Sequence, residues 1–114
     1  MPFIQVRLSA SVDAEQKNVL QGKISNVISS AFSKPQTYIM SEVTSGCSLY
    51  MNGQSLDNGA YISVSLLGGA SKSACSDATK SICDILSKDL NINGSSVYIT
   101  YHPTELWGWN GMMF

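Results

Sequence analysis

Hydrophobic and polar positions divide the chain into two halves that follow the same plan. In the first half, residues 2–8 form a strand-like apolar run. Apolar residues then recur at helical spacing, at Leu20, Ile24, Val27, Ile28, Ala31 and Phe32. Asp13 followed by Gln16 resembles a capping box and predicts the start of this helix, and Lys34-Pro35 predicts its end.

A second strand closes the first half, and a turn-rich segment over 52–59 separates the two halves. This strand is predicted over 38–43, continuing through Leu49 and Tyr50 with a break around Gly46. The second half then repeats the order of elements. These are a strand over 61–67, a break at Gly68-Gly69, a helix over 71–89 with Ala78, Ile82, Ile85 and Leu86 on one face, a turn at Asn93-Gly94, and a strand over 97–101 that ends at His102-Pro103.

Two strand–helix–strand units predict one α/β domain that spans residues 1–114. Each unit is expected to be right-handed and to pair its two strands in parallel. Side by side, the units make a four-stranded mixed sheet with both helices on one face. The strands over 61–67 and 97–101 carry apolar residues at both odd and even positions, which is typical of a sheet buried on both faces. Because no further helix is predicted, we expect another subunit to cover the second face.

The composition supports a partner surface and argues against several classes of function. Charged residues make up only 13% of the chain, about half of the usual ~25%, and the segment 106–114 is rich in aromatic residues and methionine. The net charge of -1 indicates neither a basic stripe that would bind nucleic acid nor a polybasic patch that would bind a membrane surface. No run approaches a membrane span and no leader precedes the first strand, so we expect a cytoplasmic protein whose release, if any, needs no signal peptide.

Neither a metal site nor a phosphate site is indicated, and no cofactor is predicted. His102 is the only histidine, and no cluster of Cys, Asp or Glu lies near it in the sequence. The Gly-Gly pair before the second helix lacks the lysine and the spacing of a phosphate-binding loop, so it is interpreted as a tight turn. The three cysteines form no C-x-x-C pair, and their odd number favours reduced thiols that pack as small core residues.

Pro2 is the most informative candidate for chemistry. It is small enough for Met1 to be removed, and the new N-terminus would then be a secondary amine. Beside apolar groups, such an amine loses its proton readily because desolvation disfavours the charged form. It can then act as a base near neutral pH. The alternative is that Pro2 merely starts a strand, where proline is tolerated, and the dipeptide alone favours this alternative.

Five short motifs occur together in order along the chain. They are Met1-Pro2, Lys34-Pro35, Leu67-Gly68-Gly69, Val97-Tyr98-Ile99 and Gly108-Trp109-Asn110. In combination they resemble the macrophage migration inhibitory factor family, part of the tautomerase superfamily, over essentially the whole chain. The resemblance implies a homotrimer whose three sheets wrap into a central barrel, with active sites at the subunit interfaces. It also implies cofactor-free keto–enol interconversion of phenylpyruvate- or dopachrome-type compounds.

The resemblance also implies roles for individual residues. Pro2, freed by removal of Met1, would be the catalytic base and then the acid. Lys34 would pair with the substrate carboxylate, and the backbone N–H of Val64 would donate a second hydrogen bond to it. The pocket would be lined by residues of the last strand and the tail, the first of them from a neighbouring subunit: Tyr98, Thr100, Trp107, Trp109 and Phe114.

Two departures from the family pattern keep a second interpretation open. Thr100 stands where the family often has asparagine, and it is shorter and has no amide donor. The C-x-x-C motif of some members is absent from its expected region, 56–59. If Met1 is retained, Pro2 is an amide and the site is expected to be inactive. The alternative function is therefore a cytokine-like secreted signalling or host-interaction protein with a receptor as partner and a vestigial pocket.

Overall fold

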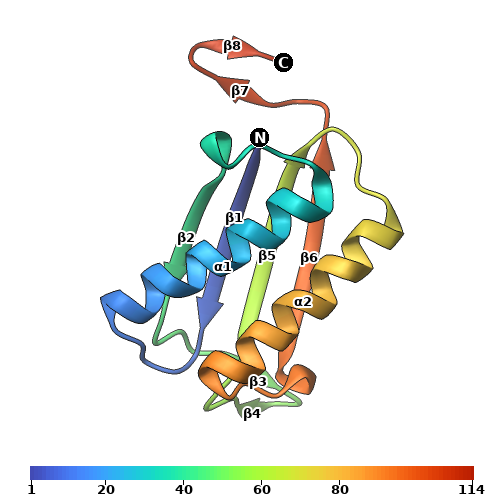
Figure 1. Cartoon of the computed structure of the whole chain (residues 1–114). Coiled ribbons are helices and arrows are strands. Elements are labelled where there is room, and N and C mark those ends of the chain that lie inside the picture. Colours follow the sequence, from blue (N-terminus) through green and yellow to red (C-terminus); the bar gives the residue numbers. More distant parts are fainter.

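Two β-α-β units lie side by side in the computed structural model, which describes all residues from 1 to 114 (Figure 1). The first unit contains β1 (Pro2–Leu8), α1 (Ala14–Phe32) and β2 (Met40–Thr44), and the second contains β5 (Ala60–Leu67), α2 (Lys72–Leu90) and β6 (Val97–Thr104). The sheet order is β2-β1-β5-β6, parallel within each unit and antiparallel where β1 meets β5. Both helices cover one face of the sheet (Figure 1), which confirms the predicted architecture.

Shorter elements extend the two ends of the sheet. They are η1 (Gln36–Tyr38), β3 (Tyr50–Met51), β4 (Gln54–Ser55), η2 (Gly94–Ser96), β7 (Gly108–Trp109) and β8 (Met112–Met113). The β7–β8 hairpin lies beyond the end of the sheet at which β1 begins, and the β3–β4 hairpin lies at the opposite end (Figure 1). No helix of the chain combines the length and the apolar character needed to span a membrane.

The core lies between the sheet and the helix layer. Alternation along β1 and β5 directs every second side chain toward the helices, and the helices contribute the matching apolar stripes. The core residues are Ile4, Val6, Leu8, Leu20, Ile24, Ile28, Ala60, Ile62, Val64, Leu66, Ala78, Ile82, Leu86 and Ile92, each at most 4% exposed. Complete burial of one such Leu or Ile stabilises the fold by about 1.5–3 kcal/mol.

Side-chain caps fix where the helices start. The backbone N–H of Gln16 donates to Oδ1 of Asp13 at 2.8 Å, and the N–H of Asp13 donates to Oε1 of Gln16 at 3.0 Å. These reciprocal bonds satisfy two donors that the first turn leaves free, and they confirm the predicted capping box. At the start of α2, Ser71 accepts one hydrogen bond, from the N–H of Ala74 at 3.1 Å.

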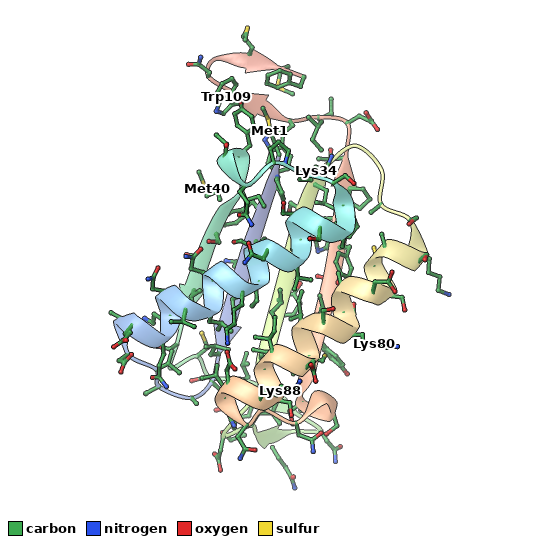
Figure 2. All side chains as sticks on the ribbon, in the orientation of Figure 1. Met1, Lys34, Met40, Lys80, Lys88 and Trp109 are labelled. Carbon is green, nitrogen blue, oxygen red and sulfur yellow. The ribbon has the colours of Figure 1, made fainter.

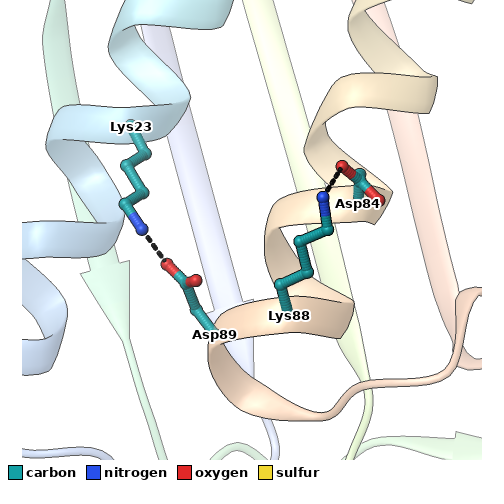
Figure 3. A network of polar contacts seen from close by, with 4 residues as sticks. All are labelled: Lys23, Asp84, Lys88 and Asp89. Atoms are coloured by element: carbon teal, nitrogen blue, oxygen red, sulfur yellow. Dashed lines mark hydrogen bonds and ion pairs between the residues drawn. The ribbon is translucent and has the colours of Figure 1, made fainter.

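An ion pair connects the two helices on their solvent side (Figure 3). Nζ of Lys23 on α1 lies 2.6 Å from Oδ2 of Asp89 on α2, and a second pair, Lys88 with Asp84, lies within α2 at 3.0 Å. Their side chains remain partly or largely exposed, so each pair contributes only about 0–1 kcal/mol. Packing of the core therefore holds the helices together.

The predicted course of the second strand is wrong at both ends. Tyr38 belongs to the 3₁₀ turn η1, and the strand itself begins at Met40 and ends at Thr44. Tyr50 does not continue it, because Gly46 turns the chain with a φ of 70° and Tyr50 then pairs with Ser55 in the separate β3–β4 hairpin.

The predicted end of the last strand is also wrong. His102-Pro103 does not terminate β6, which continues to Thr104, with Pro103 paired opposite Leu66 and Thr104 opposite Leu67. β6 is an edge strand of this sheet. Proline is tolerated on an edge strand because its missing N–H need not be used in the ladder.

The second face of the sheet is uncovered in the single chain, and it is more polar than the sequence pattern predicts. Its residues include Gln5, Arg7, Tyr61, Ser63, Ser65, Tyr98, Thr100 and His102. Tyr98 is 66% exposed. The apolar residues that the pattern assigned to this face are largely tyrosines, whose hydroxyl groups can form hydrogen bonds with water at an exposed surface. A covering subunit stays a prediction for this aromatic and polar face.

Candidate active site at the start of the first strand

Pro2 occupies the first position of β1 and is less than 2% exposed. It lies opposite Leu66 on the antiparallel neighbour β5. Since the first residue of a strand need not donate to the ladder, proline fits here without loss of a hydrogen bond. The fold thus buries Pro2 at the end of the sheet where η1, the start of β2 and the tail line a pocket.

An apolar pocket of about 220 Å³ opens beside Pro2. It is lined by Met1, Pro2, Phe3, Thr37, Tyr38, Ile39, Met40, Trp107 and Trp109. The lining comes from the start of β1, from η1 with the start of β2, and from the tail. Seven of these nine residues are hydrophobic, so a charged group within the pocket would lose much of its hydration.

The tail forms one wall of this pocket because it folds back as a hairpin. Asn110 and Gly111, with φ of 52° and 78°, make the tight turn between β7 and β8, and Asn-Gly is the pair such turns favour. The ring of Trp109 packs edge-on against Tyr38 with centroids 5.6 Å apart, and it lies 6.1 Å from the ring of Phe114. These contacts bring Trp109 and Phe114 to the end of the sheet where Pro2 lies.

Lys34 provides a cation at the same end of the sheet. Helix α1 ends at Ser33, whose left-handed φ of 53° turns the chain and directs it toward β5. Nζ of Lys34 donates to the carbonyl of Leu67 at 3.0 Å, and the N–H of Leu67 donates to the carbonyl of Met1 at 3.2 Å. Figure 2 shows Met1, Lys34 and Trp109 at this one end of the molecule.

The N-terminal amine responds to these surroundings. Burial, and then the positive charge of Lys34, lower the pKa of the Met1 ammonium below its ordinary value of 8.0. Both causes favour the unprotonated form of the Met1 amine, and an unprotonated amine is the state a base requires.

The structure does not bring every expected site residue to this pocket. The side chain of Val64 is buried in the core, and Val64 pairs with Ile4, so the residue opposite Pro2 is Leu66. Tyr98 lies beside Tyr61 on β5. Tyr61 is five positions before Leu66, the partner of Pro2, and five residues of extended strand span about 16 Å. Tyr98 therefore lies far from Pro2 of its own chain and would reach a Pro2 only in another copy.

Thr100 takes part in a polar contact that the sequence did not indicate. Its hydroxyl lies 2.7 Å from the Tyr61 hydroxyl and 2.8 Å from Nε2 of His102, all on the uncovered face. Sequence reasoning also missed Tyr38, Ile39 and Met40 as pocket residues. The signal that could have identified Tyr38 was its position just after Lys34-Pro35, but Tyr38 was interpreted as the first residue of a strand. Phe114 does not line the pocket directly and contacts it through Trp109.

Comparisons with known proteins agree with this fold. The family model described as macrophage migration inhibitory factor matches residues 1–114. The macrophage migration inhibitory factor of Xenopus laevis is 30% identical over 116 residues, covering all of this chain and 99% of that relative. A crystal structure of Leishmania major MIF2 has a TM-score of 0.90 at 25% identity and covers 100% of this chain and 97% of that one. A macrophage migration inhibitory factor-like protein of Entamoeba histolytica has a TM-score of 0.88 at 20% identity, covering 99% and 98%.

These comparisons, together with the order of the strands and Pro2 at the start of β1, place the chain in the tautomerase superfamily. Within that class, this chain belongs to the macrophage migration inhibitory factor family.

Proposed function

We propose that this protein, once Met1 has been removed, is a cofactor-free keto–enol tautomerase of phenylpyruvate- or dopachrome-type substrates. One observation supports this most strongly. The amine of Met1, directly before Pro2, lies at a pocket with mostly apolar walls, and burial and the charge of Lys34 lower its pKa. We infer that the Pro2 amine, once freed, meets the same surroundings. With Met1 in place the Pro2 nitrogen is an amide without a basic lone pair, so removal of Met1 is part of the proposal.

Pro2 moves the proton in this mechanism. In the direction from enol to keto, the free Pro2 amine takes the proton of the enol O–H, and the resulting ammonium donates it to the carbon next to the developing carbonyl. In the reverse direction, the free amine takes a proton from that carbon, its C–H electron pair becomes the C=C bond, and the ammonium donates the proton to the carbonyl oxygen. Pro2 is thus first the base and then the acid in each direction.

Lys34 holds the substrate carboxylate in this proposal. An ammonium group has three donors, and Lys34 uses one for the carbonyl of Leu67. Two donors remain for an anionic group beside Pro2. We place the rings of Trp107, Trp109 and Phe114 as the mouth of the pocket, and we leave out the predicted N–H donor of Val64, which lies opposite Ile4 within the sheet.

The site is completed by a second copy of the chain in this proposal. Tyr98 and Thr100 lie on the uncovered face, far from Pro2 of the same chain. Three copies around an axis would bring that face to the neighbouring Pro2. A structural neighbour, Pt0534, was crystallised after inactivation by 2-oxo-3-pentynoate, with a TM-score of 0.82 at 15% identity. We infer from the shared fold that a small 2-oxo acid suits the pocket here too.

A second candidate is a cytokine-like signalling role with an inactive pocket. It is favoured by the exposed tail residues Met112, Met113 and Phe114. Sequencing the N-terminus of protein from its native source separates the two roles. Retained Met1 supports signalling, and a Pro2 N-terminus supports catalysis.

The direct test of catalysis uses protein whose loss of Met1 is verified by intact mass. We expect this protein to convert enol 4-hydroxyphenylpyruvate to its keto form, and Pro2→Gly, which replaces the secondary amine, to be much slower. Equal rates for wild type and Pro2→Gly, or no conversion by the processed wild type, would contradict the proposal.

A further inference from the structure

Three side chains on the uncovered face form one continuous hydrogen-bonded chain. The Tyr61 hydroxyl meets the Thr100 hydroxyl at 2.7 Å, and the Thr100 hydroxyl meets Nε2 of His102 at 2.8 Å. Tyr61 on β5 is the register partner of Tyr98 on β6, so the two rings rise from the same stretch of this face. If Tyr98 faces the Pro2 of a neighbouring copy, Tyr61 faces it too.

Counting protons shows which of these groups is free to meet a ligand. A hydroxyl has one proton to donate and two lone pairs that accept. Thr100 already has two partners, so it donates to one and accepts from the other, and it keeps only one lone pair. Tyr61 has a single partner, and therefore it retains the larger capacity for a further hydrogen bond.

The protonation of Nε2 in His102 sets the direction of the hydrogen bonds from His102 through Thr100 to Tyr61. When Nε2 carries a proton, His102 donates to Thr100, Thr100 donates to Tyr61, and the Tyr61 O–H is free to donate outward. When Nε2 is bare, the order reverses, and Tyr61 offers only lone pairs. In both arrangements the Tyr61 hydroxyl is the end of this hydrogen-bonded series opposite His102, and it keeps the capacity for one more hydrogen bond.

We propose that Tyr61, and not Thr100, is the specificity-determining contact for the ring end of the substrate, and that it selects a hydroxylated ring. Thr100 and His102 are positioning residues that orient its hydroxyl. This inference rests on the proposed function, in which Lys34 holds the carboxylate and the ring therefore points away from Lys34. A phenol hydroxyl both donates and accepts, so it matches Tyr61 in either arrangement, whereas a bare ring leaves the Tyr61 hydroxyl unpaired.

The test is the ratio of kcat/KM for 4-hydroxyphenylpyruvate to that for phenylpyruvate, measured on protein without Met1. Tyr61→Phe is expected to lower this ratio by about tenfold, the effect of one lost hydrogen bond to a buried partner. Because the contact is made equally in ground and transition states, the change should appear in KM with kcat retained. Thr100→Val keeps the Tyr61 hydroxyl and loses only its orientation, so a drop of about threefold or less is expected.

Two further variants complete the test. His102→Gln retains a donor and an acceptor beside Thr100 and should keep the ratio within about twofold, while His102→Leu should behave like Thr100→Val. Ser63→Ala, on the same face and in register with Thr100, is the control and should leave the ratio unchanged. Thermal unfolding of each variant checks that the fold is retained.

The outcomes separate this inference from the function on which it rests. A ratio that Tyr61→Phe leaves unchanged, or that Thr100→Val or Ser63→Ala lowers as far, overturns the role of Tyr61 while the tautomerase activity stands. Processed wild type without activity on either compound overturns both proposals. A ratio that Tyr61→Phe lowers while the other variants largely keep it supports both the role of Tyr61 and the proposed function.

Discussion

The two halves of the chain share one backbone plan, shifted by 58 positions, yet only the first half carries the proline and the lysine of the candidate site, Pro2 and Lys34. Lys72, the first residue of α2, lies 58 positions after Ala14, the first residue of α1, and each helix has 19 residues. The residues that end the helices, Ser33 and Asn91, are also 58 apart and have nearly the same left-handed φ, 53° and 55°.

The agreement extends to hydrogen bonds at the two ends of the β1–β5 pair. The N–H of Leu67 donates to the carbonyl of Met1 at 3.2 Å, and the N–H of Ser9 donates to the carbonyl of Gly59 at 3.1 Å. Met1 corresponds to Gly59 and Ser9 to Leu67 under the same shift. The backbone therefore has the same hydrogen-bonded arrangement at both ends of the β1–β5 pair.

Side chains and chain position make the two ends different. Lys34 follows the first helix and bonds to the carbonyl of Leu67, whereas its counterpart Ile92 is 1% exposed and part of the core. Pro2 stands beside a chain end that can become a free amine, while its counterpart Ala60 is fixed mid-chain between two peptide bonds. In the proposed function, the chemistry therefore depends on one charged residue and one chain terminus placed on a repeated backbone.

The largest expected effect, on folding stability, comes from replacing Ile92 in the second half with lysine, the residue at the corresponding position of the first half. Ile92→Lys places an ammonium in a site that is 1% exposed. The carboxylate of Asp89 lines the same pocket, but it already pairs with Lys23. We expect a loss of folding free energy on the order of 3–5 kcal/mol, measured by urea denaturation. Ile92→Val is the control, with an expected loss of about 0.5–1.5 kcal/mol. Equal stability of Ile92→Lys and wild type would show that the two ends are less different than their burial indicates.

The reciprocal change removes the charge from the first half. Lys34→Ile is expected to lower kcat/KM for 4-hydroxyphenylpyruvate by about 10- to 100-fold, since a hydrogen bond to a charged group contributes about 1.5–3 kcal/mol. The same backbone position accepts isoleucine in the second half, so the urea midpoint should change little. Lys80→Ile, a lysine on α2 remote from this end (Figure 2), is the matched control. Unchanged kcat/KM in Lys34→Ile would remove Lys34 from the site.

The N-caps of the two helices provide a smaller difference. Asp13 and Ser71 are counterparts, but Asp13 shares two hydrogen bonds with Gln16 and Ser71 accepts only one, from Ala74. Loss of such a cap costs about 0.5–2 kcal/mol, and we expect Asp13→Ala to lie toward the upper end and Ser71→Ala toward the lower. Thermal unfolding compares the two variants, and a greater loss from Ser71→Ala would contradict the ranking.

The smallest expected effect is on the pH dependence of stability in protein that retains Met1. The pKa of its amine is lowered in the folded state, so between that value and the unfolded value of 8.0 the unfolded chain binds more protons. Stability from this group therefore rises with pH through that window and is complete above it. NMR titration should show the amine pKa moving back toward 8.0 in Lys34→Ile, but only in part, because burial is the larger cause. A fully restored pKa would show that the charge of Lys34 dominates.

The sequence contained the features that are local in the chain. Alternation in β1, the helical stripe of α1 and the Asp13–Gln16 capping box all depend on neighbours within a few residues, and all were predicted. Tyr38 was misinterpreted because its residue type favours strands, whereas the proline-led turn η1 determined its conformation. Pro103 was read as a stop, since the edge position of β6 that tolerates it depends on strands far away in the sequence.

The candidate site was predictable only in part for the same reason. Family motifs indicated Pro2 and Lys34, but the contact of Lys34 with Leu67 requires the β1–β5 register. The link from Tyr61 through Thr100 to His102 likewise requires the β5–β6 register. The Asn110-Gly111 turn, a strong hairpin signal, was taken only as part of a family motif, so the hairpin that carries Trp109 to the pocket was missed.

The most direct measurement compares the same chain with and without Met1, each form verified by intact mass, in the ketonisation of enol 4-hydroxyphenylpyruvate. Only the form that begins at Pro2 has a secondary amine at the pocket, so we expect it to turn over substrate and the form that retains Met1 to give no rate above the uncatalysed reaction. Equal rates for the two forms would contradict the central role of the Pro2 nitrogen.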